Sequence, residues 1–316
     1  MNIPTNKKDF NVLKIEKLEI WIPKKSQIDK ALSLFLPEKL DPSKLISIIE
    51  RSVCWVLNVE KVQLKELKIG GLKIYSFNEN ISLELYEDSF AQKEYRNIIR
   101  NIEKLKNKDF LFFDCGANIG VYILKLKDKF PNLQSICFEP DPLSFLVLIA
   151  NSLINNLSNL TLINAALSDK TDSKKMYGEV NNIHADSRGN SLVEEWGDRE
   201  NCGSIIVRAV ALSDFINNRS YIKIDVEGEE LNIIKNLEKF GKLRKVEGLH
   251  IEVHTTIKDK IDKYLEIQKI LSNNGFEITF NEEKEFEQYL SNNLKKWKKQ
   301  MSARIFTIEA IKKKFI

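Results

Sequence analysis

From about residue 92 the chain alternates short apolar runs with segments of helical pattern, and this alternation constrains the fold more than any other feature. Helices are expected at 92–105, 121–129, 143–153 and 257–271. Strands are expected at 110–113, 133–138, 160–163, 205–210, 221–224, 249–253, 276–280 and 304–308. Apolar strands separated by helices are typical of a parallel sheet with both faces covered. The sequence therefore predicts an α/β fold with a doubly wound, mostly parallel sheet.

The first 90 residues follow a different pattern, which predicts an N-terminal α+β accessory region ahead of a main domain at 91–316. Helices are expected at 28–36 and 42–57, a hairpin at 62–76 and a short strand at 81–86. Asp41 is the expected N-cap of the second helix. Gly70 and Gly71 are the expected turn of the hairpin. The pattern does not reveal what this region does.

Charge and cysteine content bear on partners and compartment. The chain has 49 basic and 45 acidic residues, a net charge of +4. This near balance of charges does not predict the continuous basic surface that is typical of a nucleic-acid-binding protein. The four cysteines show no CxxC spacing, the N-terminus is too polar for a signal peptide, and no apolar run reaches the ~20 residues that span a bilayer. We expect a cytoplasmic protein without a membrane span or a nucleic-acid partner, and the oligomeric state is not predicted.

A strand, a turn of small residues and a helix are expected at 111–120, where the sequence reads Leu-Phe-Phe-Asp-Cys-Gly-Ala-Asn-Ile-Gly. Gly116 permits a tight turn and Gly120 a close helix, at the edge where open α/β sheets bind ligands. A dinucleotide would require GxGxxG, but position 118 is Asn. S-adenosylmethionine has no pyrophosphate, and Asp114 can hold its cationic amino group. This turn, with Ala117 and Asn118, is a candidate S-adenosylmethionine site; an ordinary strand-to-helix turn is the alternative.

The next two strand ends continue this pattern. Glu139, within Phe-Glu-Pro-Asp at 138–141, ends the second strand, where a carboxylate can accept hydrogen bonds from both ribose hydroxyls. Its alternative role is to complement the dipole of the following helix. Asn164 and Ala165, after the third strand, could meet an adenine edge or form an ordinary polar loop. We expect these three residues and Pro140 to bind the cofactor.

The strand expected at 221–224 leads into a dense acidic run, Asp-Val-Glu-Gly-Glu-Glu at 225–230. Glu229 and Glu230 are expected to complement a helix N-terminus. Asp225 lies where the strand leaves the sheet, and a carboxylate there costs desolvation unless it has a task. We expect Asp225 to contact the cofactor and to take part in catalysis.

Four motifs together resemble the FkbM-type methyltransferase family. They lie at 114–120, 138–141, 166–169 and 222–230, within a likeness that runs from about residue 83 to about His254. The resemblance implies a class I methyltransferase fold, which is Rossmann-like with seven strands. It implies S-adenosylmethionine as methyl donor and, as acceptor, a hydroxyl of a sugar, glycan or other biosynthetic small molecule. It also implies cofactor roles for Asp114, Gly116 and Glu139, and places in the site for Asp225 and Glu227.

The strand at 248–254 reads Gly-Leu-His-Ile-Glu-Val-His, so His250, Glu252 and His254 share one face. An alcohol is a poor nucleophile, and a general base or a metal helps it to react. Three roles stay open for this face: polar support of a loop, a base or acceptor contact, and a metal site with Asp225. We favour a base without a metal, with Asp225 the first candidate, His254 the second and Glu252 the third.

The polar stretch at 178–204 is expected to be a long loop, and such loops inside a compact domain are usually functional or mobile. His184, Asn190 and Trp196 are its candidates for acceptor contacts; a solvated insertion is the alternative.

Other functions stay open because a fold alone does not decide chemistry. They are a nicotinamide-dependent oxidoreductase, an RNA methyltransferase and a non-catalytic binding module.

Overall fold

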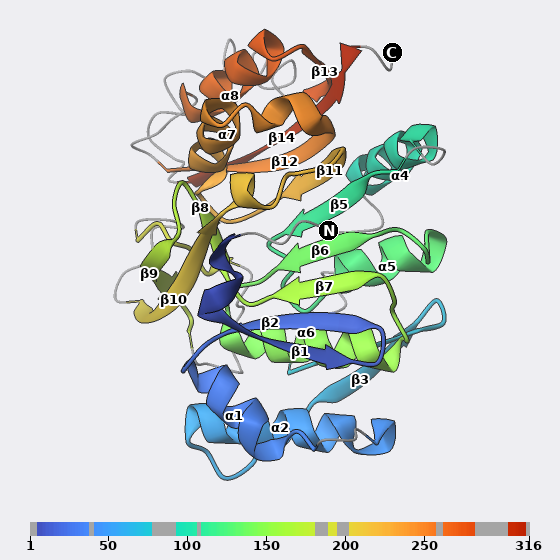
Figure 1. Ribbon diagram of the computed structural model, residues 1–316, viewed down its shortest axis with the longest axis vertical. Helices are drawn as coiled ribbons and strands as arrows, with labels where there is room; N and C mark the ends of the chain where they lie inside the picture. Colours follow the sequence, from blue (N-terminus) through green and yellow to red (C-terminus); the bar gives the residue numbers. More distant parts are fainter. Residues whose placement is uncertain are drawn as a thin grey trace. The chain divides into compact units, whose positions relative to one another are not determined.

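The computed structural model describes residues 5–37, 41–77, 93–105, 109–180, 189–194, 202–256, 262–281 and 303–313. The chain divides into two compact units (Figure 1). The first unit contains Met1–Ala166 and Glu179–Arg188, and the second contains Leu167–Gly178 and Gly189–Ile316. The strand expected at 81–86 lies outside the described residues.

Five strands of the first unit lie side by side in the order β1-β2-β7-β6-β5 (Figure 1). They are β1 (Phe10–Ile15), β2 (Leu18–Pro23), β7 (Leu160–Ile163), β6 (Ser135–Phe138) and β5 (Leu111–Cys115). Neighbours are parallel from β2 to β5, and β1 is antiparallel to β2. The sequence predicted β5, β6 and β7 but missed β1 and β2. These two strands extend the sheet of the main domain from within the stretch predicted to be accessory, whose boundary at residue 90 stays a prediction.

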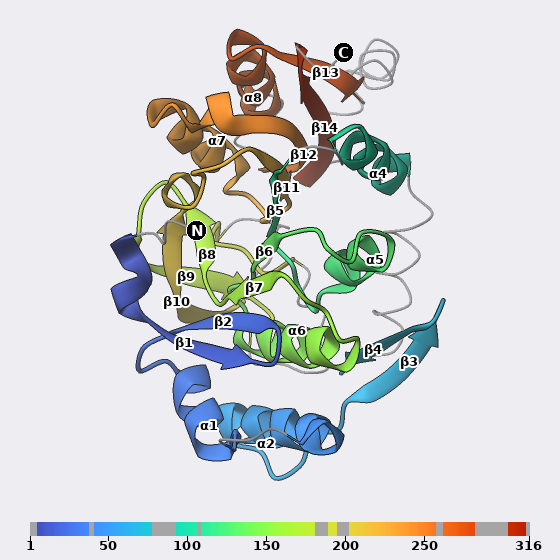
Figure 2. The same cartoon turned by 45° about the vertical axis from the view of Figure 1, so that its right-hand side comes forward.

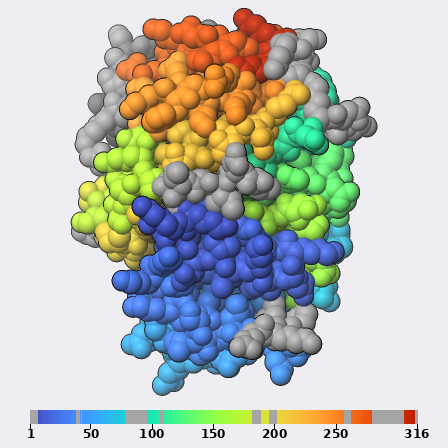
Figure 3. All heavy atoms as spheres, viewed as in Figure 1, coloured from blue at the N-terminus to red at the C-terminus, as the bar shows by residue number. Residues whose placement is uncertain are grey.

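Helices of the N-terminal stretch cover this unit on one side. The helices α1 (Gln27–Phe35) and α2 (Leu45–Leu57) pack against each other and against α6 (Pro142–Ile154), as Figures 1 and 2 show. Residues of the N-terminal elements, coloured blue, form much of the molecular face seen in Figure 3. The helix α6 is buried along nearly its whole length, which explains why its sequence is apolar on every side.

The expected cap of the second helix is only partly correct. A short 3₁₀ turn, Pro42–Lys44, precedes α2, and Lys44 occupies the N-cap position without a side-chain hydrogen bond. The carboxylate of Asp41 accepts the backbone N–H of Ser43 at 3.0 Å. Asp41 therefore caps the 3₁₀ turn, and the α-helix begins at Leu45, three residues later than the predicted start at Pro42.

Asn151 of α6 and Asn155, the C-cap residue of that helix, hold the predicted hairpin, β3 (Lys65–Ile69) and β4 (Leu72–Ser76). The Asn151 amide accepts the Tyr75 N–H at 2.7 Å and donates to the Tyr75 carbonyl at 3.1 Å. The Asn155 amide does the same for Lys73, at 3.0 and 2.7 Å. Because side chains four apart share a helix face, the two amides pair with alternate residues of β4.

Two further helices among the described residues of this unit are α4 (Lys93–Leu105) and α5 (Val121–Lys129), both close to their predicted ranges. Within the described residues, no helix combines the length and apolar character needed to cross a bilayer.

Four strands of the second unit pair in the order β11-β12-β14-β13. They are β11 (Ser220–Ile224), β12 (Val246–Thr256), β14 (Ala303–Lys312) and β13 (Phe276–Asn281). β11 and β12 are parallel, whereas β14 is antiparallel to both of its neighbours. α7 (Glu230–Lys239) and α8 (Asp262–Asn273) pack against each other and against β12. The α/β fold class is confirmed; the main sheet has nine strands within the described residues, where seven were predicted.

A small sheet of the second unit corrects one expectation. The strand predicted at 205–210 exists as β10 (Gly203–Ala211), but it does not join the parallel sheet. It lies between β8 (Ala166–Ser168) and β9 (Asp172–Gly178), and it is antiparallel to β9. The strand β9 was not expected because its side chains are mostly polar and partly exposed.

Candidate functional site

The turn after β5 lies against the end of the neighbouring strand. Asp114 is fully buried and stands opposite Cys137 of β6. The backbone N–H groups of Gly116 and Ala117 both donate to the carbonyl of Phe138, at 3.0 and 2.9 Å. These bonds fix the turn that the sequence singled out at the carboxyl ends of β5 and β6.

Gly120 is explained by backbone conformation and packing. Its φ is +89°, a region that other residues rarely adopt. A Cβ at this position would lie 2.5 Å from Cδ1 of Leu148 in α6. The glycine therefore lets the start of α5 approach α6, as its sequence context suggested, and this role needs no ligand contact.

Glu139 joins the two loops that follow β5 and β6. Its carboxylate accepts the N–H of Asn118 at 2.8 Å and the N–H of Asp141 at 2.7 Å. Asp141 itself caps α6 by accepting two backbone N–H groups, at 3.0 and 2.8 Å. The helix-dipole role considered for Glu139 thus belongs to Asp141. Burial, and then the nearby carboxylates of Asp141 and Asp114, raise the pKa of Glu139 to about 8.

The amide of Asn164 stabilises the same loop. Its Nδ2 donates to the carbonyls of Glu139 and Pro140, at 2.9 and 3.2 Å. Its backbone N–H donates to the carbonyl of Trp21 in β2. The donors of Asn164 therefore hold the polar loop that was the alternative interpretation, and contact of Asn164 or Ala165 with adenine stays a prediction.

This group of residues fits a ligand with positive charge and hydroxyl donors. Asp114 and Glu139 are both buried carboxylates, and the charge of Asp114 contributes to the raised pKa of Glu139. An anionic pyrophosphate would add to their repulsion, whereas a cationic amino group or sulfonium would reduce it. Ribose hydroxyls can donate to the lone pairs of Glu139 that the backbone N–H groups leave available. The chemistry of the first unit therefore suits S-adenosylmethionine.

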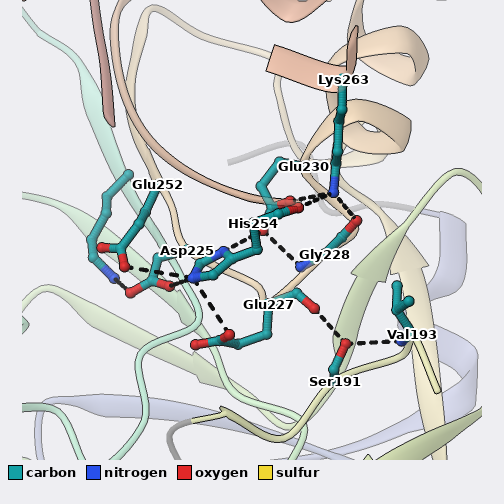
Figure 4. A network of polar contacts seen from close by, with 10 residues as sticks. Ser191, Val193, Asp225, Glu227, Gly228, Glu230, Glu252, His254 and Lys263 are labelled. Carbon is teal, nitrogen blue, oxygen red and sulfur yellow. Dashed lines mark hydrogen bonds and ion pairs between the residues drawn. The ribbon is translucent and has the colours of Figure 1, made fainter. Parts of the chain in front are cut away.

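A second polar group, which we call the His254 cluster, lies in the second unit (Figure 4). Its members are Asp225, Glu227, Glu230, Glu252, His254 and Lys263. Asp225 follows β11, and Glu252 and His254 lie on the parallel neighbour β12. Because parallel strands end at the same edge, the two strand ends bring these side chains together, as the sequence predicted.

His254 stands at the centre of this cluster and is 1% exposed. Its Nδ1 lies 2.9 Å from Oε1 of Glu230. Its Nε2 faces three other carboxylates, 3.4 Å from Glu227, 3.5 Å from Glu252 and 3.9 Å from Asp225. Figure 4 shows the ring with one nitrogen directed to Glu230 and the other to these three acids.

Glu230 has a role that the sequence did not predict. It was expected to complement the N-terminus of α7, but it is fully buried and its carboxylate contacts His254. Lys263 of α8 donates to Glu230 at 2.9 Å, to the carbonyl of His254 at 2.7 Å and to the carbonyl of Gly228. One signal was available: Lys263 occupies the face of α8 that it shares with Ile267 and Ile270, which are buried.

Mutual repulsion and burial shift the ionisation of the cluster. Burial raises the pKa of Glu227 to about 8 and also raises the pKa of Asp225. Burial opposes the charge of Glu230, but hydrogen bonds from His254 and Lys263 lower its pKa to about 2. Burial likewise opposes the charge of His254, but the surrounding carboxylates raise its pKa well above the ordinary value. The site thus favours positive charge at its centre.

The described part of the 178–204 stretch anchors the turn that carries Glu227. Ser191 pairs with Tyr177 of β9, and its hydroxyl donates to the carbonyl of Glu227. Glu227 has a φ of +56°, and a Cβ at Gly228 would lie 2.8 Å from Cγ2 of Val193. Residues 191–193 therefore fit closely over this turn. His184 and Trp196, two of the predicted acceptor contacts, lie outside the described residues.

His250 lies on the same face of β12 as Glu252 and His254, but its side chain contacts Glu309. Its Nδ1 lies 2.7 Å from Oε1 of Glu309, the residue opposite it on β14, and both side chains are buried. Tyr221 donates to the same carboxylate at 3.4 Å. The structure therefore shows a polar contact between two strands for His250, whereas the polar role considered for this face was support of a loop.

The comparisons with known proteins agree with these motifs. The family model described as "Methyltransferase FkbM domain" matches residues 114–278, more than half of the chain. Methyltransferase sdnD of Sordaria araneosa is 26% identical over 247 residues, which cover 67% of this chain and 89% of that protein. The 31-O-demethyl-FK506 methyltransferase FkbM of Streptomyces tacrolimicus is 25% identical over 239 residues, covering 66% of this chain and 87% of that protein.

A solved structure of TYW2 from M. jannaschii in complex with AdoMet covers 80% of this chain and 88% of its own, with 12% identity and a TM-score of 0.38. That likeness is remote, and the family model carries the assignment. The resemblance drawn from the four motifs is confirmed: this chain belongs to the FkbM family of S-adenosylmethionine-dependent methyltransferases.

Proposed function

We propose that the protein transfers the methyl group of S-adenosylmethionine to a hydroxyl oxygen of a sugar, glycan or other biosynthetic small molecule. The observation that carries this proposal is the His254 cluster, in which four carboxylates surround a buried histidine and burial raises the pKa values of Asp225 and Glu227. A hydroxyl must lose its proton as it is methylated, and a positioned carboxylate whose pKa is raised is a stronger acceptor for that proton. One relative is named for 31-O-demethyl-FK506, a name in which the demethylated position is an oxygen.

The first unit supplies the proposed cofactor residues. Asp114 accepts hydrogen bonds from the amino group of the cofactor, and Glu139 accepts hydrogen bonds from the ribose hydroxyls. Two backbone N–H groups hold the carboxylate of Glu139 in place. The turn of Gly116, Ala117 and Asn118 provides close backbone approach, and Gly120 supports it through packing. Pro140, Asn164 and Ala165 flank the adenine. When bound, S-adenosylmethionine supplies a methyl group on a sulfonium, whose C–S electron pair stays with sulfur on transfer.

The second unit supplies the proposed acceptor residues. Asp225 receives the proton of the acceptor hydroxyl, because it is only half buried and its pKa is raised. His254 and Glu252 orient Asp225 and share the charge that develops, through the contacts of Nε2. Asp225 is also proposed to contact the cofactor, as the sequence indicated. Because the chain belongs to a methyltransferase family, we no longer consider a nicotinamide-dependent oxidoreductase. Methylation of RNA is the alternative that the assay below tests.

The test is a transfer assay with methyl-labelled S-adenosylmethionine. The wild-type chain is offered a panel of sugars, glycans and hydroxylated macrolides, with transfer RNA as a separate arm. We expect label on a hydroxyl oxygen of a small molecule, identified by mass spectrometry of the product, and no label when Asp225→Asn replaces the wild type. Label on RNA alone, or on nitrogen or carbon alone, would contradict the proposal.

A further inference from the structure

The two nitrogens of His254 have different surroundings, and the difference points to a ligand. Nδ1 has an ordinary hydrogen-bond distance of 2.9 Å to Glu230. Nε2 lies 3.4 to 3.9 Å from three carboxylates, and Glu252 is its hydrogen-bond partner among them. Three acids from two segments of the chain thus converge on one buried ring nitrogen.

Such distances match the spacing between ligands of one metal ion. Metal–ligand bonds of about 2.0–2.4 Å place neighbouring ligand atoms about 3–4 Å apart in tetrahedral or octahedral geometry. One ligand atom from each of Asp225, Glu227 and His254 lies within 4.8 Å of the others. The oxygen of Glu252 lies 3.5 Å from Nε2, so it can add a fourth ligand. These atoms can therefore share one cation after small rotations of their side chains.

The surroundings of His254 provide a second, independent indication. A histidine that binds a metal through one ring nitrogen almost always donates the other N–H to a carboxylate or carbonyl, which fixes its tautomer. Glu230 provides that partner, and its own position is fixed by Lys263 and the N–H of Gly228. Binding of a cation would require the tautomer in which Nδ1 carries the proton and the lone pair of Nε2 faces the three acids.

Charge balance also favours a cation. The cluster contains four carboxylates, and the lysines that contact them are Lys223, 3.1 Å from Asp225, and Lys263, 2.9 Å from Glu230. Lys223 also lowers the pKa of Glu252, so within the described residues two lysines face four carboxylates. Buried like charges are costly unless a cation or a proton is bound among them.

We propose that Asp225, Glu227 and His254 bind a divalent cation of the Mg²⁺ or Mn²⁺ type, with Glu252 as a further oxygen ligand. Oxygen-rich sites with one imidazole suit Mn²⁺, and Mg²⁺ shares the preference for carboxylates. The role that we give to this cation rests on the proposed function. A bound cation lowers the pKa of a hydroxyl that it contacts, and this assists methylation of the oxygen. It changes our preference from a base without a metal to activation of the hydroxyl by a metal that Asp225 binds.

Binding can be measured on the full chain without any acceptor or turnover. The protein is treated with a chelator, desalted and titrated with MnCl₂, while the signal of free Mn²⁺ is followed by electron paramagnetic resonance. We expect one saturable site that Mg²⁺ displaces, and an affinity at least tenfold lower in Glu227→Gln and His254→Gln. Glu229→Gln is the matched control, because Glu229 belongs to the same acidic run but contacts Ser168 and Asn232 instead.

Each outcome decides the inference. No saturable Mn²⁺ or Mg²⁺ binding by the wild type at millimolar concentration would overturn it, even if the variants failed to fold. Equal binding by wild type, Glu227→Gln and His254→Gln would also overturn it, because the cation would then bind elsewhere. Methyl transfer without cation binding would refute this inference alone. Cation binding without transfer to any hydroxyl would refute only the proposed function.

Discussion

Cofactor affinity should depend on pH through one residue, Glu139. Its pKa is raised to about 8 in the free protein, by burial first and then by Asp141 and Asp114. Ribose hydroxyls donate hydrogen bonds, so they favour the ionised carboxylate. Ligand affinity should therefore follow the ionised fraction, which rises from about one tenth at pH 7 to about nine tenths at pH 9. We expect roughly a tenfold gain in affinity over this interval.

The matched variant is Glu139→Gln, which keeps the shape and loses the charge. It should bind S-adenosylhomocysteine about 1.5–3 kcal/mol more weakly above pH 8, the scale of a hydrogen bond to a charged group, and Glu139→Ala should lose at least as much. Its affinity should also lose the pH dependence attributed to Glu139. Calorimetric titration of both proteins from pH 6.5 to 9 measures these differences. Equal affinities with the same pH profile would refute the role of Glu139 and leave it a loop-stabilising residue.

The same shift affects the stability of the ligand-free protein. The pKa of Glu139 in the folded state lies above its ordinary value near 4.5. A group of this kind contributes its full stability below the unfolded pKa, and the contribution is lost as pH rises through the folded pKa. The wild type should therefore lose stability between about pH 4.5 and 8 relative to Glu139→Gln. Melting curves of the two proteins across this range give the difference.

Other predictions concern the ligand and the packing. S-adenosylhomocysteine should raise the melting temperature by mass action and NAD should not; stabilisation by NAD alone would count against the cofactor assignment. Gly120→Ala should cost about 1–3 kcal/mol beyond Gly71→Ala in urea unfolding, because both have positive φ but a Cβ at Gly71 meets nothing within 4 Å; equal costs would disprove the overlap. Asn151→Ala should cost about 1–3 kcal/mol, and more than Asn155→Ala, since Asn151 is buried; the reverse order would contradict this account.

Local pattern was enough to predict the helices and strands that carry the motif residues, although not every strand of the core. Continuous apolar runs gave β5, β6, β7, β11 and β12, whose carboxyl ends carry the motif residues. Pattern alone did not predict which strands pair. β10 is apolar enough for the main sheet, yet it pairs with the polar strand β9, and this choice depends on tertiary contacts. β1 and β2 were missed because they join the sheet through β7, more than 130 residues away in sequence.

The site shows the same division between local and distant information. Alternation on β12 correctly placed Glu252 and His254 together, and parallel strands brought them to Asp225. The contacts of Glu230 and Lys263 could not be derived locally, because these residues meet His254 across 24 and 9 positions of the chain. Similarly, the amide of Asn164 was expected at a ligand, but a neighbouring loop uses its donors.

The most direct test of the central claim, methylation of a hydroxyl with the His254 cluster as acceptor side, is a paired measurement on Glu252→Gln and His254→Ala. Turnover on the acceptor found in the transfer assay and affinity for S-adenosylhomocysteine are measured for each, with melting temperature as the check of folding. Because both residues support Asp225 on the acceptor side and neither is proposed to hold the cofactor, we predict that turnover falls about 10²–10⁴-fold while affinity for S-adenosylhomocysteine stays at the wild-type value. Full turnover in both folded variants would contradict the claim and exclude this cluster as the catalytic centre.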